Sequence, residues 1–193
     1  MRNNRPVNKI FGIGLPKTGT HSLIKALSLL GYKAFHCPVE IRTALWAGEE
    51  NFDWFNGGDW DAIANVAEIH YPQLDKKYPN SKFILTVRDE KSWIESLEKL
   101  YIMKGHVKDR IEQMLCETKM SRVYLFGSAV FVKERALYIY DLHNRLVKDY
   151  FKNRPADLLI LNITKGEGWK KLCPFLNKDI PDRIFPKEYV SKI

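Results

Sequence analysis

The feature that most constrains this chain is a glycine-bearing loop between an apolar run and an amphipathic stretch near the N-terminus. Residues 12–22 read Gly-Ile-Gly-Leu-Pro-Lys-Thr-Gly-Thr-His-Ser. A strand, a loop of this kind and the start of a helix form a cradle for phosphate, because backbone N–H groups and the helix dipole point at the anion. The sequence therefore predicts a nucleotide site at this segment, which we call the phosphate loop.

The lysine of the phosphate loop stands in a different place from the lysine of ATP-binding loops. The pattern G-x-x-x-x-G-K-[ST] has its lysine directly after the second glycine. Here Gly19 is followed by Thr20 and His21, and the only lysine of the loop, Lys17, lies two residues before Gly19. This shift points away from ATP and Mg²⁺ as ligands.

Two segments together suggest a family. Residues 16–22 read Pro-Lys-Thr-Gly-Thr-His-Ser, and the strand-like run 82–87 ends in Arg88, with Ser96 eight positions on. The first segment resembles the P-K-[ST]-G-T-[TS]-[SW] loop of the sulfotransferases, which transfer a sulfuryl group from 3'-phosphoadenosine-5'-phosphosulfate (PAPS) to an acceptor. The second is similar to their strand-ending arginine and following serine. The resemblance implies that Arg88 and Ser96 hold the 3'-phosphate of the nucleotide.

The resemblance covers residues 9–186, and its C-terminal stretch, 158–176, is similar to a soluble, mainly microbial branch of the family. It implies that PAPS is the sulfuryl donor. In sulfuryl transfer, charge builds on the oxygen that leaves with the 5'-phosphate, much as in phosphoryl transfer, and Lys17 would stabilise it. Lysine and backbone dipoles supply that stabilisation, so no metal is implied. The loop residues expected to bind the nucleotide are Pro16, Lys17, Thr18, Gly19, Thr20, His21 and Ser22.

The sequence leaves open which residue is the general base that takes the proton of the acceptor. In the family, a histidine, glutamate or aspartate just beyond the middle strand commonly has this role. Related enzymes often have an aspartate near Asn65, and an asparagine cannot accept the proton. Glu68 and His70 are therefore the catalytic candidates, and His36 is a third choice. The usual pKa of His70 suits neutral pH, whereas Glu68 needs burial to raise its pKa.

Alternating strands and helices predict the fold class. Apolar or β-branched runs bounded by turn residues predict strands over 9–14, 33–36, 61–66, 82–87 and 158–163. Apolar spacing and stop signals predict a first helix that ends at Gly31, a helix capped by Asp89, and a long helix over 133–152. We expect an α/β fold of three layers and of the P-loop type, with a central, mostly parallel β-sheet flanked by helices. Ligands then bind at the carboxyl ends of the strands, where Lys17 and Arg88 lie.

Length and charge bound the domain organisation and the partners. With 193 residues, 45% of them hydrophobic, residues 1–193 are expected to form a single domain. The formal net charge of +8 favours an anionic ligand such as PAPS. The basic residues are scattered as on a solvated surface, so we predict no nucleic-acid partner. The oligomeric state is open.

The cysteines and the N-terminal residues indicate a cytoplasmic protein. Cys37, Cys116 and Cys173 are odd in number and far apart, which argues against a disulfide framework or a structural zinc site. The N-terminus lacks the apolar core of a signal peptide, and no run reaches the ~20 apolar residues that span a bilayer. We therefore expect a soluble cytoplasmic enzyme with no membrane partner.

The acceptor is expected to be a small molecule of unknown identity. Segments 48–59 and 101–128 are expected to be loops that shape its pocket, and Trp169 is expected to be a core anchor. Two other functions stay open. A nucleotide kinase or NTPase would require Mg²⁺-dependent ATP turnover but lacks G-K-[ST]. A non-catalytic nucleotide-binding protein would keep the cradle and have no base, and Asn65 favours that alternative.

Overall fold

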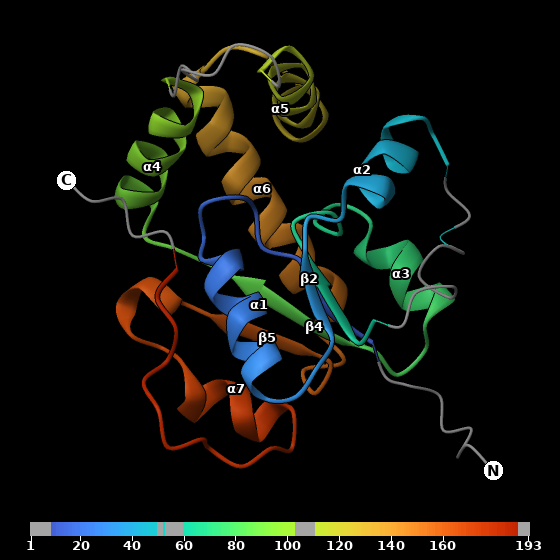
Figure 1. Ribbon diagram of the computed structural model, residues 1–193, viewed down its shortest axis with the longest axis vertical. Helices are drawn as coiled ribbons and strands as arrows, with labels where there is room; N and C mark the ends of the chain where they lie inside the picture. The colour runs from blue at the N-terminus through green and yellow to red at the C-terminus, as the bar shows by residue number, and fades with distance from the viewer. Residues whose placement is uncertain (1–8, 50–51, 53–59, 103–110, 189–193) are drawn as a thin grey trace.

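A central sheet of five parallel strands organises the protein. The computed structural model describes residues 9–49, 52, 60–102 and 111–188 (Figure 1). The strands follow the order β2-β3-β1-β4-β5 across the sheet. Each of the predicted strands is confirmed and lies within its predicted range. Their bounds are Ile10–Gly12 (β1), Ala34–His36 (β2), Ala62–Ala64 (β3), Lys82–Thr86 (β4) and Leu158–Leu161 (β5).

The strand that leads into the phosphate loop is at the centre of this sheet. Ile10 of β1 lies opposite Ala62 of β3 on one side and opposite Lys82 of β4 on the other. Parallel strands have their carboxyl ends at the same edge of a sheet. The segments that follow β1, β3 and β4 therefore leave the sheet next to one another.

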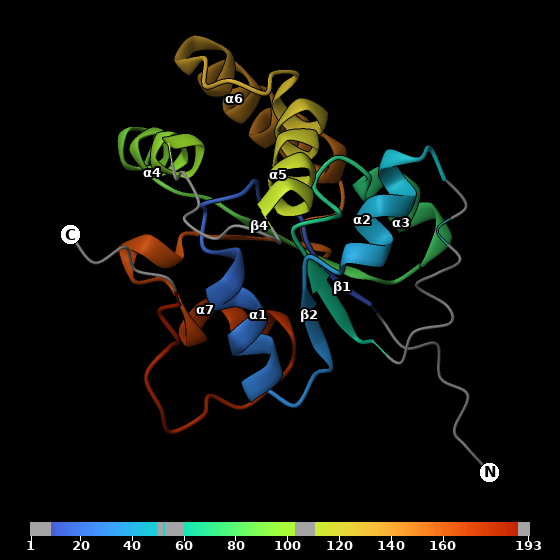
Figure 2. The ribbon, with the colours of Figure 1, turned by 45° about the horizontal axis from the view of Figure 1, so that its top comes forward.

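Helices cover both faces of the sheet, as the predicted α/β class requires. Buried side chains of α1 and α7 pack on one face, and those of α2, α3 and α6 pack on the other. A third cluster joins α4, α5 and α6 beside the phosphate loop, and Figure 2 shows these helices on the same side of the sheet. The described helices are α1 (Thr20–Leu29), α2 (Val39–Trp46), α3 (Tyr71–Lys77), α4 (Glu90–Ile102), α5 (Ile111–Phe126), α6 (Lys133–Phe151) and α7 (Trp169–Phe175).

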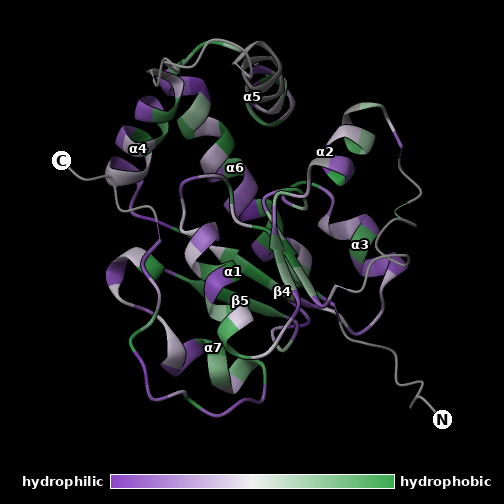
Figure 3. Ribbon diagram, viewed as in Figure 1, coloured by the Kyte–Doolittle hydropathy of each residue, from purple (hydrophilic) through white to green (hydrophobic). Residues whose placement is uncertain are grey.

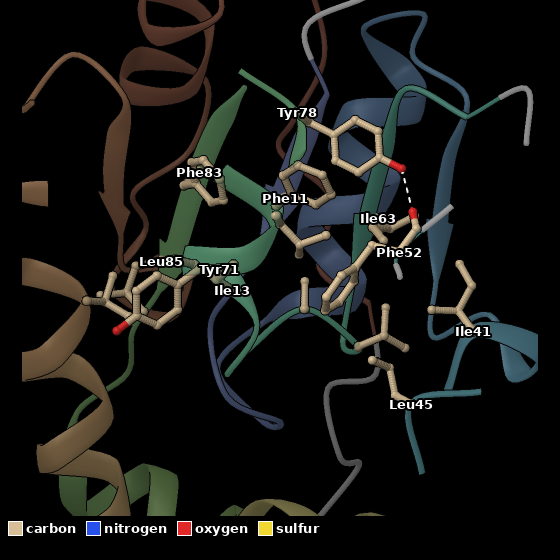
Figure 4. Packing of buried hydrophobic residues seen from close by; sticks show 14 of the residues in the cluster. Phe11, Ile13, Ile41, Leu45, Phe52, Ile63, Tyr71, Tyr78, Phe83 and Leu85 are labelled. Carbon is tan, nitrogen blue, oxygen red and sulfur yellow. Dashed lines mark hydrogen bonds between the residues drawn. The ribbon is translucent and has the colours of Figure 1, made fainter. Parts of the chain in front are cut away.

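The three central strands, β1, β3 and β4, are buried on both faces, which explains their continuous apolar sequences. Figure 3 shows the strands as the most hydrophobic part of the ribbon. On the face covered by α3 and α6, Phe11 stacks on Phe83 with ring centroids 5.4 Å apart. Figure 4 shows this cluster, in which the Tyr78 hydroxyl donates to the carbonyl of Phe52 over 2.7 Å. The core thus holds β1 rigidly at the base of the phosphate loop.

One segment differs from its predicted structure. Residues 101–128 were expected to form a loop, and the structure instead has helix α5 over Ile111–Phe126. The apolar residues of this helix are spread around its axis and do not form one apolar face, so the sequence lacks the usual helical signal. Of the other expected loop, 48–59, residues 50–51 and 53–59 lie outside the described residues. Within the ranges that the structure describes, none of the helices is long and apolar enough to cross a membrane.

Candidate active site

The phosphate loop has an unusual backbone conformation at its lysine. Lys17 has φ of 72° and Gly19 has φ of 105°, so both lie in the left-handed region. A non-glycine residue rarely adopts this region, and such strain is often found at functional sites. The buried hydroxyl of Thr18 donates to the carbonyl of Leu15 over 2.6 Å. The same oxygen lies 2.6 Å from Thr86 Oγ1 of β4, which links the loop to the neighbouring strand.

Gly14 allows the loop to pass directly against β4. A Cβ atom at this position would lie 2.0 Å from Oγ1 of Thr86 and 2.4 Å from its carbonyl oxygen. The second contact is with backbone, so a side-chain rotation would not remove it. Close approach of two chains, rather than a turn, is therefore the reason for glycine here.

Arg88 contacts the phosphate loop through its guanidinium. Nη1 donates to the carbonyl of Lys17 over 3.3 Å, and Nε donates to Oγ of Ser92 over 3.1 Å. Arg88 forms no ion pair with the neighbouring Asp89 or Glu90, both of which the structure describes. Asp89 instead caps α4, as predicted, since its Oδ1 accepts from the N–H of Ser92 over 3.1 Å. Arg88 and Lys17 thus lie beside each other at the carboxyl edge of β1 and β4.

Lys17 is half-buried next to this second cation. Burial lowers the pKa of its ammonium group, and the positive charge of Arg88 lowers it further. Among the ion pairs between described residues, none involves Lys17 or Arg88. Two neighbouring cations that have no acidic partner create a positive potential suited to an anion.

Two histidines meet at the start of α1, His21 from the helix itself and His36 from the end of β2. The rings of His21 and His36 stack with centroids 3.5 Å apart. Nε2 of His36 lies 3.0 Å from Oγ1 of Thr20. Burial, and then the neighbouring His21, lower the pKa of His36 to about 3, so this ring is neutral at physiological pH. The pKa of His21 is also lowered, first by burial and then by Lys17. The structure therefore brings His21 and His36 together with Lys17 and Thr20.

Glu68 and His70 follow β3, the strand next to β1. Glu68 is buried, which raises its pKa to about 8, and no hydrogen-bond partner is found for its Oε1 among the described residues. His70 is also buried, and its Nε2 is hydrogen-bonded to the hydroxyl of Tyr124 of α5. Asn65 has φ of 66°, a left-handed conformation that asparagine adopts more readily than most residues. Aspartate shares this tolerance, so the backbone at position 65 does not explain why asparagine stands where aspartate was expected.

The C-terminal segment reaches the phosphate loop, which sequence reasoning did not predict. The backbone N–H of Glu188 donates to Oγ of Ser22 over 2.9 Å. The preceding chain is held by Trp169, whose indole N–H donates to the carbonyl of Arg183 over 2.8 Å and whose ring packs on Phe185. Trp169 is buried in the core, as expected.

Several residues that contact the loop were missed from the sequence. Trp93 of α4 donates to the carbonyl of Pro16, and Tyr140 of α6 is hydrogen-bonded to the backbone of Arg88. Nε2 of His143, one turn after Tyr140, is hydrogen-bonded to the carbonyl of Ile13 over 2.8 Å. Ser96, predicted to act with Arg88, is half-buried and one turn beyond Ser92 on α4. No three His, Cys, Asp or Glu side chains group as metal ligands in the described part of the chain.

Comparisons with known proteins show a family, a relative and a fold that this chain resembles. The sequence model of a family described as a sulfotransferase domain matches residues 9–192. Over 210 aligned residues, the chain is 28% identical to "Ava biosynthesis cluster protein M" of Aspergillus versicolor, covering 92% of this chain and 79% of that protein. A crystal structure of a sulfotransferase from Alicyclobacillus acidocaldarius matches with a TM-score of 0.55 and 15% identity, over 95% of this chain and 85% of that one. At that identity, the structural likeness shows the fold alone.

Proposed function

Since this chain belongs to the sulfotransferase domain family, we propose that it transfers a sulfuryl group from PAPS to a hydroxyl or amine of a small-molecule acceptor. The observation that carries the proposal is the contact between Arg88 and the carbonyl of Lys17. It brings the guanidinium of Arg88 against the main chain of Lys17, and these two cationic residues follow different strands. A nucleotide with phosphate groups at both its 5' and 3' positions presents two anionic sites that such a pair would bind.

The donor groups around the phosphate loop fit such a nucleotide. Lys17, the hydroxyls of Thr20 and Ser22, and the N–H groups at the start of α1 are suited to the 5'-phosphate, because the first N–H groups of a helix have no intrahelical acceptor. Arg88 offers a planar fork of donors for the 3'-phosphate, and Ser96 can add a hydroxyl. PAPS, when bound, supplies the activated sulfuryl group. The remaining loop residues, Pro16, Thr18, Gly19 and His21, shape this cradle.

Lys17 and one buried acid–base group would share the catalytic work. We propose that Lys17 stabilises the negative charge of the leaving phosphate oxygen and that Glu68 or His70 takes the proton of the acceptor. We favour Glu68, because its Oε1 has no hydrogen-bond partner among the described residues and its pKa is about 8. His70 already uses Nε2 in its hydrogen bond with Tyr124. His36 is held by Thr20 and is a weaker candidate, since its pKa of about 3 makes it a poor proton acceptor at neutral pH.

The setting of this activity also remains a proposal. We propose that residues 1–193 act as one cytoplasmic domain and that no metal takes part. The name of the Aspergillus versicolor relative refers to a biosynthesis cluster, which favours a small molecule made by other biosynthetic enzymes as the acceptor.

Binding and transfer can be tested separately. Adenosine 3',5'-bisphosphate (PAP), the nucleotide product, should raise the melting temperature of the protein, and Mg²⁺ with ATP should not. Incubation with radiolabelled PAPS and mixtures of phenols, alcohols, sugars and amines should then yield a labelled product. Mg²⁺-dependent ATP turnover would favour a kinase or NTPase. Stabilisation by PAP without transfer to any acceptor class would favour a non-catalytic nucleotide-binding protein.

A further inference from the structure

Two aromatic residues connect the phosphate loop to the Arg88 segment. Trp93 of α4 is fully buried, and its indole N–H donates to the carbonyl of Pro16 over 2.9 Å. Pro16 directly precedes Lys17. The indole therefore holds the main chain of the loop at the residue before the loop lysine.

Tyr140 of α6 holds the Arg88 segment in the same way. Its hydroxyl donates to the carbonyl of Arg88 over 2.6 Å and accepts from the backbone N–H of Arg88 over 2.9 Å. Both backbone groups of one residue are therefore satisfied by one side chain. Burial raises the pKa of this phenol, so the hydroxyl keeps the proton that it donates.

These two side chains also contact each other. The rings of Trp93 and Tyr140 stack with centroids 4.2 Å apart and an interplanar angle of 27°. Leu15 of the phosphate loop packs in the same buried cluster. A continuous path of contacts thus runs from Pro16 through the two rings to Arg88, in addition to the direct contact between Arg88 and the carbonyl of Lys17.

We propose that Trp93 and Tyr140 are positioning residues that set the spacing between the 5'-phosphate and 3'-phosphate subsites. This inference rests on the proposed function, in which Lys17 serves the first subsite and Arg88 the second. Neither ring needs to touch the nucleotide. Trp93 acts through the carbonyl of Pro16, which precedes Lys17, and Tyr140 acts through the main chain of Arg88 itself. Their effects on the two subsites are therefore expected to differ.

Replacement of Tyr140 by phenylalanine isolates its role. The variant Tyr140→Phe keeps the stacked ring and removes only the hydroxyl, which leaves the N–H and carbonyl of Arg88 without this partner. We expect the Kd for PAP to rise about 5- to 20-fold, the usual range for lost buried hydrogen bonds. The Kd for adenosine 5'-monophosphate, which has no 3'-phosphate, should stay within about 2-fold. The variant Tyr138→Phe is the control, because Tyr138 is 62% exposed on the same helix.

Trp93→Phe should weaken the binding of both nucleotides equally. It keeps a buried aromatic ring and removes the donor to Pro16, so the affinities for PAP and for adenosine 5'-monophosphate should fall by the same factor. In an Arg88→Ala background, Tyr140→Phe should have no further effect on PAP binding. A merely structural role would instead lower both affinities in proportion to lost stability, and melting curves measure that loss.

The outcomes separate this inference from the proposed function. Absence of PAP binding by the unmodified protein would overturn both. PAP binding with an unchanged ratio of the two nucleotide affinities in Tyr140→Phe would overturn only the positioning role. Should Tyr140→Phe fail to fold, Trp93→Phe decides: an equal loss of both affinities at an unchanged melting temperature supports the inference. Unchanged affinities, or losses that match a loss of stability, contradict it.

Discussion

The guanidinium of Arg88 donates a hydrogen bond to the main-chain carbonyl of Lys17, although 71 positions separate the two residues. The contact exists because β1 and β4 are neighbouring parallel strands that end at the same edge of the sheet. The charge of Arg88 also contributes to the lowered pKa of Lys17, after burial. An anion bound between these groups would relieve their mutual repulsion, and the first two predictions follow from this.

Replacing Lys17 by alanine should lower kcat about 10²-fold or more, the usual loss when one fixed electrostatic donor is removed from a transition state. Steady-state kinetics with saturating PAPS measure this effect. Lys25→Ala is the matched control, because Lys25 is an exposed lysine of α1, the helix that follows the phosphate loop. An unchanged kcat in Lys17→Ala would remove this residue from the proposed mechanism.

Arg88→Ala should weaken the binding of PAP about 10- to 100-fold, since hydrogen bonds between charged groups contribute about 1.5–3 kcal/mol. Calorimetric titration with PAP and with adenosine 5'-monophosphate measures both affinities, and only the first should fall strongly. Lys99→Ala, which removes an exposed cation of α4, should change neither. Undiminished affinity of Arg88→Ala for PAP would contradict a role at the 3'-phosphate.

The buried carboxyl of Glu68 should make stability depend on pH. Burial raises the pKa of Glu68 from 4.5 to about 8, so the folded state keeps the proton up to a higher pH than the unfolded state does. The stabilisation from this proton is complete below pH 4.5 and is lost as pH rises through 8. The variant Glu68→Gln cannot ionise. Between pH 5 and 9, its unfolding free energy should therefore rise relative to that of the unmodified protein by on the order of a few kcal/mol. Urea denaturation across this range checks it, and a constant difference would show that Glu68 ionises normally.

The same carboxyl is expected to govern the reaction rate. If Glu68 takes the proton of the acceptor, kcat/KM should rise with pH until about 8, where the carboxyl is ionised. Glu68→Gln should then lower kcat about 10²- to 10⁴-fold, the usual contribution of a general base. His70→Gln should have only a small effect. A large loss in His70→Gln together with near-normal rates in Glu68→Gln would assign the role to His70.

Gly14→Ala should disturb the loop through a backbone clash. The added methyl group would overlap the carbonyl oxygen of Thr86, so β1 and β4 must separate at the site. We expect a loss of about 1–3 kcal/mol in unfolding free energy, typical of overpacking, together with weaker PAP binding. Gly31→Ala is the control: Gly31 has φ of 88° and open space around it at the far end of α1. Gly31→Ala should lose some stability through backbone strain and keep its affinity for PAP. Equal losses of PAP affinity in both variants would argue against a local effect of Gly14.

The sheet could be predicted from the sequence because its strands are short apolar runs, and the three central strands, β1, β3 and β4, are buried on both faces. Asp89 was found as a helix cap for a similarly local reason, since its carboxylate bonds within its own turn. Helix α5 was missed, because its residues do not form one apolar stripe. Local patterns thus gave the elements that have a clear hydrophobic face or a local cap.

The candidate site was predictable only where residue type and order carry the chemistry. Lys17 and Arg88 were predicted from the resemblance of the loop and of the strand-ending arginine to a known family, and the structure brings these two residues into contact. The roles of Trp93 and Tyr140 could not be predicted, since they contact main-chain atoms of residues 77 and 52 positions away and any buried aromatic residue looks alike in sequence. The stacking of His21 on His36 likewise depends on how α1 lies against β2, which local sequence does not determine.

The anchoring of the phosphate loop has a consequence for the thermodynamics of ligand capture. The loop is tied to the sheet by Thr18 and Thr86, to α4 by the indole of Trp93, and to Arg88 through the carbonyl of Lys17. A nucleotide that enters meets a preorganised cradle, so little conformational entropy has to be surrendered for ordering it. Discrimination among nucleotides should then reflect how well their charges match fixed positions, with induced fit confined to the acceptor side.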